Sequence, residues 1–267
     1  MFWTRLLSGI GLVIAALLLV GLGGPVLLAA LALISLMGIY ELNHVIGMEK
    51  KLPGIAALLA GAVYYLWLFV QGPEAELPLQ GVLLWLMVLM CMLVAFYPRY
   101  SSRDLFFSFV SVLYAGGMLS YVWRARQLWG GDVVWLIFLS AWGSDTLAYC
   151  AGRLFGRHKM TPNLSPKKTW EGFVGGVAGA ACLGAIYGAV FSSGMPLAVP
   201  AAGCALICFV GALLSVVGDL AASAIKREYQ VKDYGHIIPG HGGIMDRFDS
   251  VLFTAPAIFV TASLLMH

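Results

Sequence analysis

The residues best suited to chemistry lie in one stretch near the C-terminus, residues 223–249. This stretch gathers acidic, basic and histidine side chains and four glycines in a chain that is 61% hydrophobic and only 11% charged. Its run Pro239-Gly240-His241-Gly242-Gly243 cannot stay helical, because proline removes a backbone donor and glycine admits conformations barred to other residues. Such a loop can direct several N–H groups toward one anion, although a plain tight turn has the same composition.

An aspartate precedes this loop at the end of an apolar stretch. If that stretch is helical, Asp219, Ser223 and Lys226 lie on one face, so a carboxylate, a hydroxyl and an ammonium point the same way. The plain alternative is a helix-end charge in headgroup water. Because an acid at membrane depth is costly, however, Asp219 is a functional candidate.

Two further aspartates follow the loop, with Arg247 between them. We expect the last helix to begin near Val251, with Asp249 or Ser250 as its cap, which leaves Asp246 to bind a metal. Aspartates from separate helix ends, basic side chains and a glycine loop suit Mg²⁺ and a nucleoside triphosphate, since carboxylates are hard ligands and cations hold phosphate oxygens.

A second polar block lies earlier in the chain. Asp145 sits within an apolar stretch, and the pairs Gly152-Arg153 and Gly156-Arg157 lead to Ser165-Pro166-Lys167-Lys168-Thr169-Trp170-Glu171-Gly172. Hydroxyls beside paired lysines suit a phosphate site. A positively charged membrane anchor is the alternative, and it explains the lysines but not the whole run.

The elements that must position these residues are membrane helices. A soluble domain carries about 25% charged residues, so lipid is the expected solvent for most of this chain. Apolar stretches of the roughly 17 to 25 residues that cross a bilayer predict an all-α, polytopic membrane protein of about nine helices, at residues 6–22, 25–40, 54–71, 79–97, 105–123, 133–151, 172–191, 199–217 and 251–266.

The basic residues predict the orientation of these helices. Threaded alternately, nine spans place 14 of the 16 Lys and Arg residues on the side of the N-terminus. Positive loops stay in the cytoplasm, so the N-terminus and both polar blocks are expected there. Only Arg124 and Arg126 fall on the opposite side, and they are expected to mark the end of a longer, tilted helix.

One membrane domain over residues 1–267 is the economical organisation, with hydrophobic spans in 1–130 and catalytic spans and cytoplasmic loops in 131–267. The glycines from Gly172 to Gly188 recur at a small-xxx-small spacing that favours close helix packing. Cys204 and Cys208 are expected to be buried small hydrophobes. Topology accounts for the net charge of +3, so no nucleic-acid partner is expected.

Together these motifs resemble those of the phosphatidate cytidylyltransferases, also called CDP-diacylglycerol synthases. The resemblance rests on SAIKR, KDYG and IPGHGGIMDRFD in the later block, and on GSDTLAYCAGRLFGRHKM with SPKKTWEG in the earlier one. It covers roughly residues 142–172 and 215–250, and a signature with this many fixed positions is far more specific than a lone glycine motif.

The resemblance implies an inner-membrane enzyme, a homodimer, that converts phosphatidate and CTP into CDP-diacylglycerol and pyrophosphate with its active site facing the cytoplasm. It assigns Mg²⁺ to Asp219 and Asp246, and whether a second cation such as K⁺ joins Mg²⁺ is left open. The other implied catalytic positions are Ser223, Lys226, Arg227, Lys232, Asp233, His241, Arg247 and Asp249. The expected substrate-binding positions are Asp145, Ser165, Lys167, Lys168, Thr169, Gly240, Gly242 and Gly243.

The sequence departs from the family at one position, because Ala222 stands where many relatives have Glu. Two rival functions remain open. A transporter would line an ion path with Asp145, Asp219 and Asp246, but the charges cluster at one face of the membrane. An alcohol phosphotransferase using CDP-diacylglycerol would show several aspartates at DxxD-type spacing in one run, and here only Asp246 and Asp249 do so.

Overall fold

The computed structural model describes residues 2–75, 78–191, 195, 197–237 and 242–266, with side chains described from residue 9 onward. The chain packs as two compact units, residues 1–123 with 229–247 and residues 124–228 with 248–267. The first unit therefore joins the N-terminal helices to most of the C-terminal polar segment. Helices α6 and α11 each begin in one unit and end in the other.

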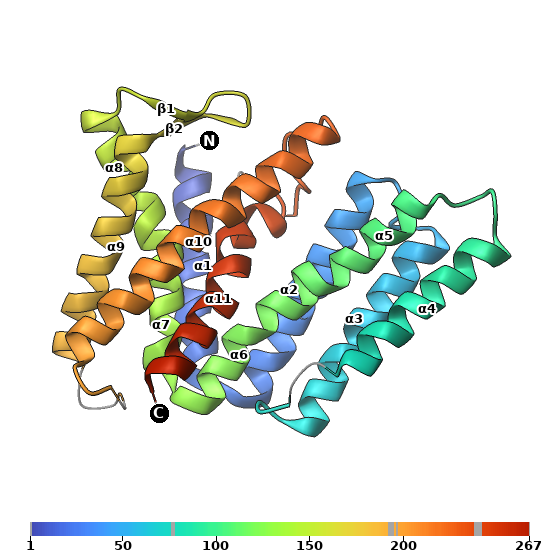
Figure 1. The fold of residues 1–267 in the computed structure, drawn as a ribbon, viewed down its shortest axis with the longest axis horizontal. Coiled ribbons are helices and arrows are strands. Elements are labelled where there is room, and N and C mark those ends of the chain that lie inside the picture. The colour runs from blue at the N-terminus through green and yellow to red at the C-terminus, as the bar shows by residue number, and fades with distance from the viewer. Residues whose placement is uncertain (1, 76–77, 192–194, 196, 238–241, 267) are drawn as a thin grey trace. The chain divides into compact units, whose positions relative to one another are not determined.

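Helices make up most of both units (Figure 1). The first part of the chain forms α1 (Phe2–Leu22), α2 (Gly24–Val45), α3 (Leu52–Gln71), α4 (Leu79–Ala95), α5 (Ser102–Ser111), the π-helical segment η1 (Val112–Gly117) and α6 (Met118–Trp129). The second part forms α7 (Gly131–Phe138), the π-helical segment η2 (Leu139–Gly143), α8 (Ser144–Phe155), β1 (Lys159–Thr161), β2 (Ser165–Thr169), α9 (Trp170–Val190), α10 (Pro200–Glu228) and α11 (Met245–Leu265).

A helix occupies each of the nine predicted spans. Within the described residues, seven helical stretches are long and apolar enough to cross a membrane, whereas Gly9–Leu22 and Leu79–Ala95 are shorter apolar helices. The total of nine crossings stays a prediction. Large apolar side chains are exposed along these helices, with Val94 80% and Leu264 73% exposed, as expected where lipid covers the surface.

The all-α prediction missed one small element. Strands β1 and β2 pair antiparallel between α8 and α9, with Lys159 opposite Thr169 and Thr161 opposite Ser165 (Figure 1). The sequence predicts a loop here, because the five residues of β2, Ser-Pro-Lys-Lys-Thr, carry no apolar alternation of the kind that reveals a strand.

The predicted longer helix around Arg124 and Arg126 is confirmed, since α5, η1 and α6 run without a break from Ser102 to Trp129. Both arginines lie within this helix, and the guanidinium of Arg124 is buried over the ring of Phe259, 4.8 Å from its centroid. Their position inside a helix explains why these two basic residues depart from the loop pattern.

The predicted close helix packing of the α9 glycines is also confirmed. A Cβ on Gly176 would lie 2.8 Å from the backbone oxygen of Ser144 in α8, and one on Gly184 would lie 2.5 Å from the backbone oxygen of Cys204 in α10. α9 therefore packs directly on the backbones of both neighbours. Cys204 and Cys208 are buried, as predicted. The result is a close-packed group of α8, α9 and α10 that carries the earlier polar block.

Candidate functional site

Helix α10 continues past the membrane-length stretch to Glu228, so the predicted common face of Asp219, Ser223 and Lys226 exists. The hydroxyl of Ser223 donates to Oδ1 of Asp219 at 3.4 Å. The other oxygen of Asp219, Oδ2, lies 2.5 Å from the ammonium of Lys168 on β2. Asp219 thus links the C-terminal part of α10 to the hairpin.

Two further carboxylates of the same unit belong to this group. Asp145 lies in the first turn of α8 and accepts a hydrogen bond from the hydroxyl of Ser250, 3.4 Å away. Asp249, half-buried on α11, interacts electrostatically with Asp219, Lys226 and Asp145. Three carboxylates from three helices therefore converge, and such like charges repel one another unless a proton or a cation neutralises them.

The α10 and α11 backbones approach closely beside these carboxylates. A Cβ on Gly218 would lie only 2.5 Å from the backbone oxygen of Asp249. Glycine is therefore required for the two helices to pack here, one residue before Asp219.

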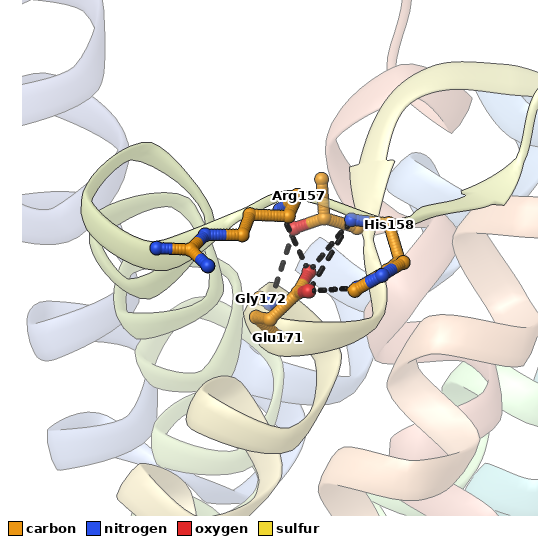
Figure 2. A network of polar contacts seen from close by, with 5 residues as sticks. Arg157, His158, Glu171 and Gly172 are labelled. Carbon is orange, nitrogen blue, oxygen red and sulfur yellow. Dashed lines mark hydrogen bonds and ion pairs between the residues drawn. The ribbon is translucent and has the colours of Figure 1, made fainter.

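One cation, Lys168, reaches the group from the hairpin. The hairpin is held at its base by Glu171 (Figure 2). The carboxylate of Glu171 accepts hydrogen bonds from the backbone N–H groups of Arg157 and His158 at 3.1 and 3.2 Å, and lies 2.6 Å from Nδ1 of His158. Thr169 caps α9 by accepting the N–H of Gly172 at 3.1 Å. Both contacts fix the direction in which the hairpin leaves the helices.

A cavity of about 520 Å³ lies between the hairpin, α8, α9 and α10. Its ionisable lining comprises Asp145, Arg153, Lys159, Lys167, Lys168 and Asp219. Four of these side chains are cationic and two are anionic, so the cavity suits a ligand that carries several negative charges. Its size is that of a small-molecule site.

Arg153 and Lys159 were not among the predicted substrate-binding residues. Arg153 donates from Nη1 to the hydroxyl of Tyr149, at 3.0 Å, one helical turn earlier on α8. The sequence did indicate basic residues here, because Arg153 and Lys159 belong to the basic run after Asp145. The basic run alone did not show which of its side chains line the cavity and which, such as Arg157, do not.

Asp219 and the nearby carboxylates suit Mg²⁺ as part of a site that a phosphate ligand completes. Among the described residues, no three histidine, cysteine or carboxylate side chains lie close enough to hold a metal by themselves. Mg²⁺ commonly binds through one or two carboxylates and completes its coordination with water and substrate phosphates. Asp219 together with the nearby carboxylates meets this description when a phosphate ligand is present.

Asp246 belongs to the other unit, where it organises the backbone. Its buried Oδ2 accepts the N–H groups of Tyr234 at 2.9 Å and Gly243 at 3.0 Å. The predicted helix start near Val251 is wrong, because α11 begins at Met245 and Asp246 lies in its first turn. Apolar periodicity marked only where the helix becomes hydrophobic, whereas its polar first turn is held by hydrogen bonds from distant residues.

The remaining predicted residues differ in exposure and location. Arg227, Lys232, Arg247 and Lys167 are exposed, and Asp233 and Ser165 are half-buried. Gly242 has a positive φ of 87°, which favours glycine. Gly240 and His241 lie outside the described residues. Since Asp219 and Asp246 belong to different units, their pairing as metal ligands stays a prediction.

Residues 3–265 match the family described as "Cytidylyltransferase family". The chain is 33% identical over 277 residues to the phosphatidate cytidylyltransferase of Bacillus subtilis, with 97% of each chain covered. It is 33% identical to the protein of that name from Staphylococcus haemolyticus, covering 89% of this chain and 90% of the relative. It is 32% identical to the protein of that name from Staphylococcus aureus, covering 88% of this chain and 89% of the relative.

Proposed function

The chain belongs to the cytidylyltransferase family, and from this premise we propose that it transfers CMP from CTP to phosphatidate. The products are CDP-diacylglycerol, for phospholipid biosynthesis, and pyrophosphate. The observation that carries this function is the cavity in which Asp219 and Asp145 face Arg153, Lys159, Lys167 and Lys168, beneath a hairpin at the end of membrane-length helices.

The cations of the cavity would bind and orient the phosphate groups. Lys167 and Lys168 come from β2, and Arg153 comes from α8, so a ligand in the cavity is approached from different directions. Positioning of this kind is the larger part of catalysis in phosphoryl transfer, because the protein contributes little covalent chemistry. Lys226, in electrostatic contact with Asp249, adds positive charge on α10.

Mg²⁺ is the expected cofactor, and Asp219 and Asp246 would hold it, with K⁺ as an open second cation. When bound, Mg²⁺ neutralises phosphate charge and stabilises the charge that develops on the leaving group. Asp219 has the donor chemistry for this role, and its Oδ2 is now held by the Lys168 ammonium. In Asp246, Oδ2 accepts two backbone hydrogen bonds, which fix the orientation of this carboxylate.

The nucleophile requires no general base. Phosphatidate is a phosphomonoester with a second pKa of about 6, so at neutral pH most of its molecules carry a second negative charge. A phosphate oxygen of phosphatidate forms a bond to the α-phosphorus of CTP as the bond from that phosphorus to the bridging oxygen breaks, and pyrophosphate leaves with the electron pair. What the protein must overcome is repulsion between two anions, which the cavity cations reduce.

The active site is proposed to face the cytoplasm of a bacterial-type inner membrane, and the protein to act as a homodimer. The 14-to-2 distribution of Lys and Arg among the predicted loops supports the orientation. CTP is cytosolic and the phosphate of phosphatidate lies at headgroup level, so a site at the cytoplasmic surface meets both substrates.

Purified protein in mixed micelles tests this function. With CTP, Mg²⁺ and phosphatidate present, we expect pyrophosphate and CDP-diacylglycerol to form in equal amounts, and no pyrophosphate to form without phosphatidate. A transporter would release no pyrophosphate. An alcohol phosphotransferase would instead consume CDP-diacylglycerol and release CMP when given an alcohol. Either result would reject the proposed function.

A further inference from the structure

Glu41, on the second helix of the chain, is a buried carboxylate with a defined pair of partners. Its side chain is only 1% exposed. Oε1 accepts the N–H of Ile244 at 2.9 Å, and Oε2 accepts the N–H of Met245 at 2.8 Å. Because the first N–H groups of a helix lack partners within that helix, Glu41 supplies acceptors at the start of α11 from about 200 residues away in the chain.

Two glycines make room for this carboxylate. A Cβ on Gly235 would lie 2.5 Å from Oε1 of Glu41, and a Cβ on Gly243 would lie 2.6 Å from both of its oxygens. Any side chain at either position would collide with Glu41. Neither contact requires an unusual backbone, since only Gly242 of these neighbouring glycines has a positive φ. A side chain at either position would therefore displace the Glu41 carboxylate from its place.

Asp246 accepts hydrogen bonds from the same segment. Its Oδ2 accepts the N–H groups of Tyr234 and Gly243, and Glu41 accepts those of the next two residues, Ile244 and Met245. Two carboxylates thus satisfy three consecutive backbone N–H groups at the entry to α11. The position of Asp246 in the first turn depends on where that turn begins, and Glu41 binds the backbone N–H groups at this point.

We infer that Glu41 is a positioning residue of the transferase, which fixes the start of α11 and through it the carboxylate of Asp246. The part that concerns catalysis rests on the proposed function, in which Asp246 serves the reaction. A buried carboxylate could also serve fold stability alone. The two roles differ in what they change, because a positioning residue alters the behaviour of the folded enzyme, whereas a stabilising residue alters the fraction that is folded.

The first test uses Glu41→Gln, with Glu49→Gln of the same unit as the matched control. Glutamine keeps one acceptor oxygen but turns an NH₂ group toward the second backbone N–H, so one hydrogen bond is replaced by a donor–donor contact. Hydrogen–deuterium exchange of the metal-free protein should then show faster exchange of the amides of Ile244 and Met245 in Glu41→Gln only. Unchanged exchange at these amides would overturn the inference.

The second test measures turnover of the same two variants. With folded, solubilised protein we expect Glu41→Gln to lower kcat about 10- to 100-fold, the range typical of partners that orient metal ligands, and to raise the Mg²⁺ concentration for half-maximal rate. A fall in kcat with unchanged Mg²⁺ dependence would indicate only a smaller active fraction and would also overturn the inference. An inactive wild-type protein would instead reject the proposed function. The hydrogen–deuterium exchange result would then still test the contact of Glu41 with Ile244 and Met245.

A double-mutant cycle gives an independent test of the Glu41–Gly243 contact. Gly243→Ala alone should lower activity, because its Cβ collides with the carboxylate. In the Glu41→Ala background the same change should add less than about a twofold effect, since residues in contact are not additive. Effects that multiply would contradict the contact. If Glu41→Gln does not fold, Gly235→Ala, which displaces the carboxylate without removing it, carries the exchange and Mg²⁺ tests.

Discussion

The ammonium of Lys168 lies 2.5 Å from Oδ2 of Asp219, so β2 and α10 are joined by an ion pair at the wall of the cationic cavity. Both side chains are about one-quarter exposed, at 23% and 28%. A partly exposed pair of this kind contributes about 1 kcal/mol to stability. In the proposed function its importance is chemical, because an incoming phosphate would offer Lys168 a new partner and leave Asp219 available to a cation.

Lys168→Gln should weaken CTP binding more than it affects folding. Loss of a hydrogen bond to a charged group costs about 1.5 to 3 kcal/mol, which corresponds to a rise in the KM for CTP of roughly 10- to 100-fold. Steady-state kinetics at saturating phosphatidate measure this change. Lys51→Gln, in a loop of the other unit, is the control. An unchanged KM for CTP would show that Lys168 does not contact the nucleotide.

Asp219→Asn and Asp246→Asn keep the size of each side chain and remove its charge. Each should reduce turnover by at least about 100-fold, the upper end of the range for residues that only orient a ligand, while the protein remains folded in detergent. Turnover with Mg²⁺ and thermal unfolding measure the two properties, with Glu74→Gln as the control. Near-normal activity of both variants would refute their assignment as Mg²⁺ ligands.

Glu171→Gln should loosen the hairpin without unfolding the helices. The carboxylate accepts two backbone N–H groups and contacts the ring of His158 (Figure 2), and a neutral amide accepts such bonds less strongly. We expect faster proteolysis or amide exchange at residues 157–169 and a higher KM for CTP, with little change in kcat. If exchange at the hairpin stays as in the wild type, Glu171 does not hold it in place.

The proposed orientation predicts which loops are accessible from outside. In a cysteine-free background, single cysteines replacing the exposed Lys50 and Arg99 should resist an impermeant thiol reagent added to intact spheroplasts, and one replacing Glu74 should react. All three should react after lysis, which controls for local accessibility. The reverse pattern of labelling in intact cells would invert the topology.

The direct mechanism predicts inversion at phosphorus. A single in-line displacement on the α-phosphorus of CTP inverts its configuration, whereas two displacements through a cytidylyl-enzyme intermediate on His241 or Ser223 would retain it. A chiral α-thio analogue of CTP, followed by analysis of the CDP-diacylglycerol product, distinguishes the two. Retention would exclude direct attack by phosphatidate.

The sequence by itself determined the helices and the segments in which chemistry occurs. Apolar length predicts each span, helical periodicity places Asp219, Ser223 and Lys226 on one face, and glycine spacing predicts the packing of α9. These properties depend on residues near one another in the chain. The same local patterns therefore predict that the polar segments gather at helix ends.

Only the tertiary structure decided which distant groups meet. Lys168 contacts Asp219 across 51 positions, and Ser250 contacts Asp145 across 105. Glu41, an acid in an apolar helix without a motif of its own, accepts backbone N–H groups more than 200 residues away, and α11 begins six residues earlier than its hydrophobicity indicates. Such pairs follow from how closely backbones pack, which depends on the whole set of helix contacts rather than on any one segment.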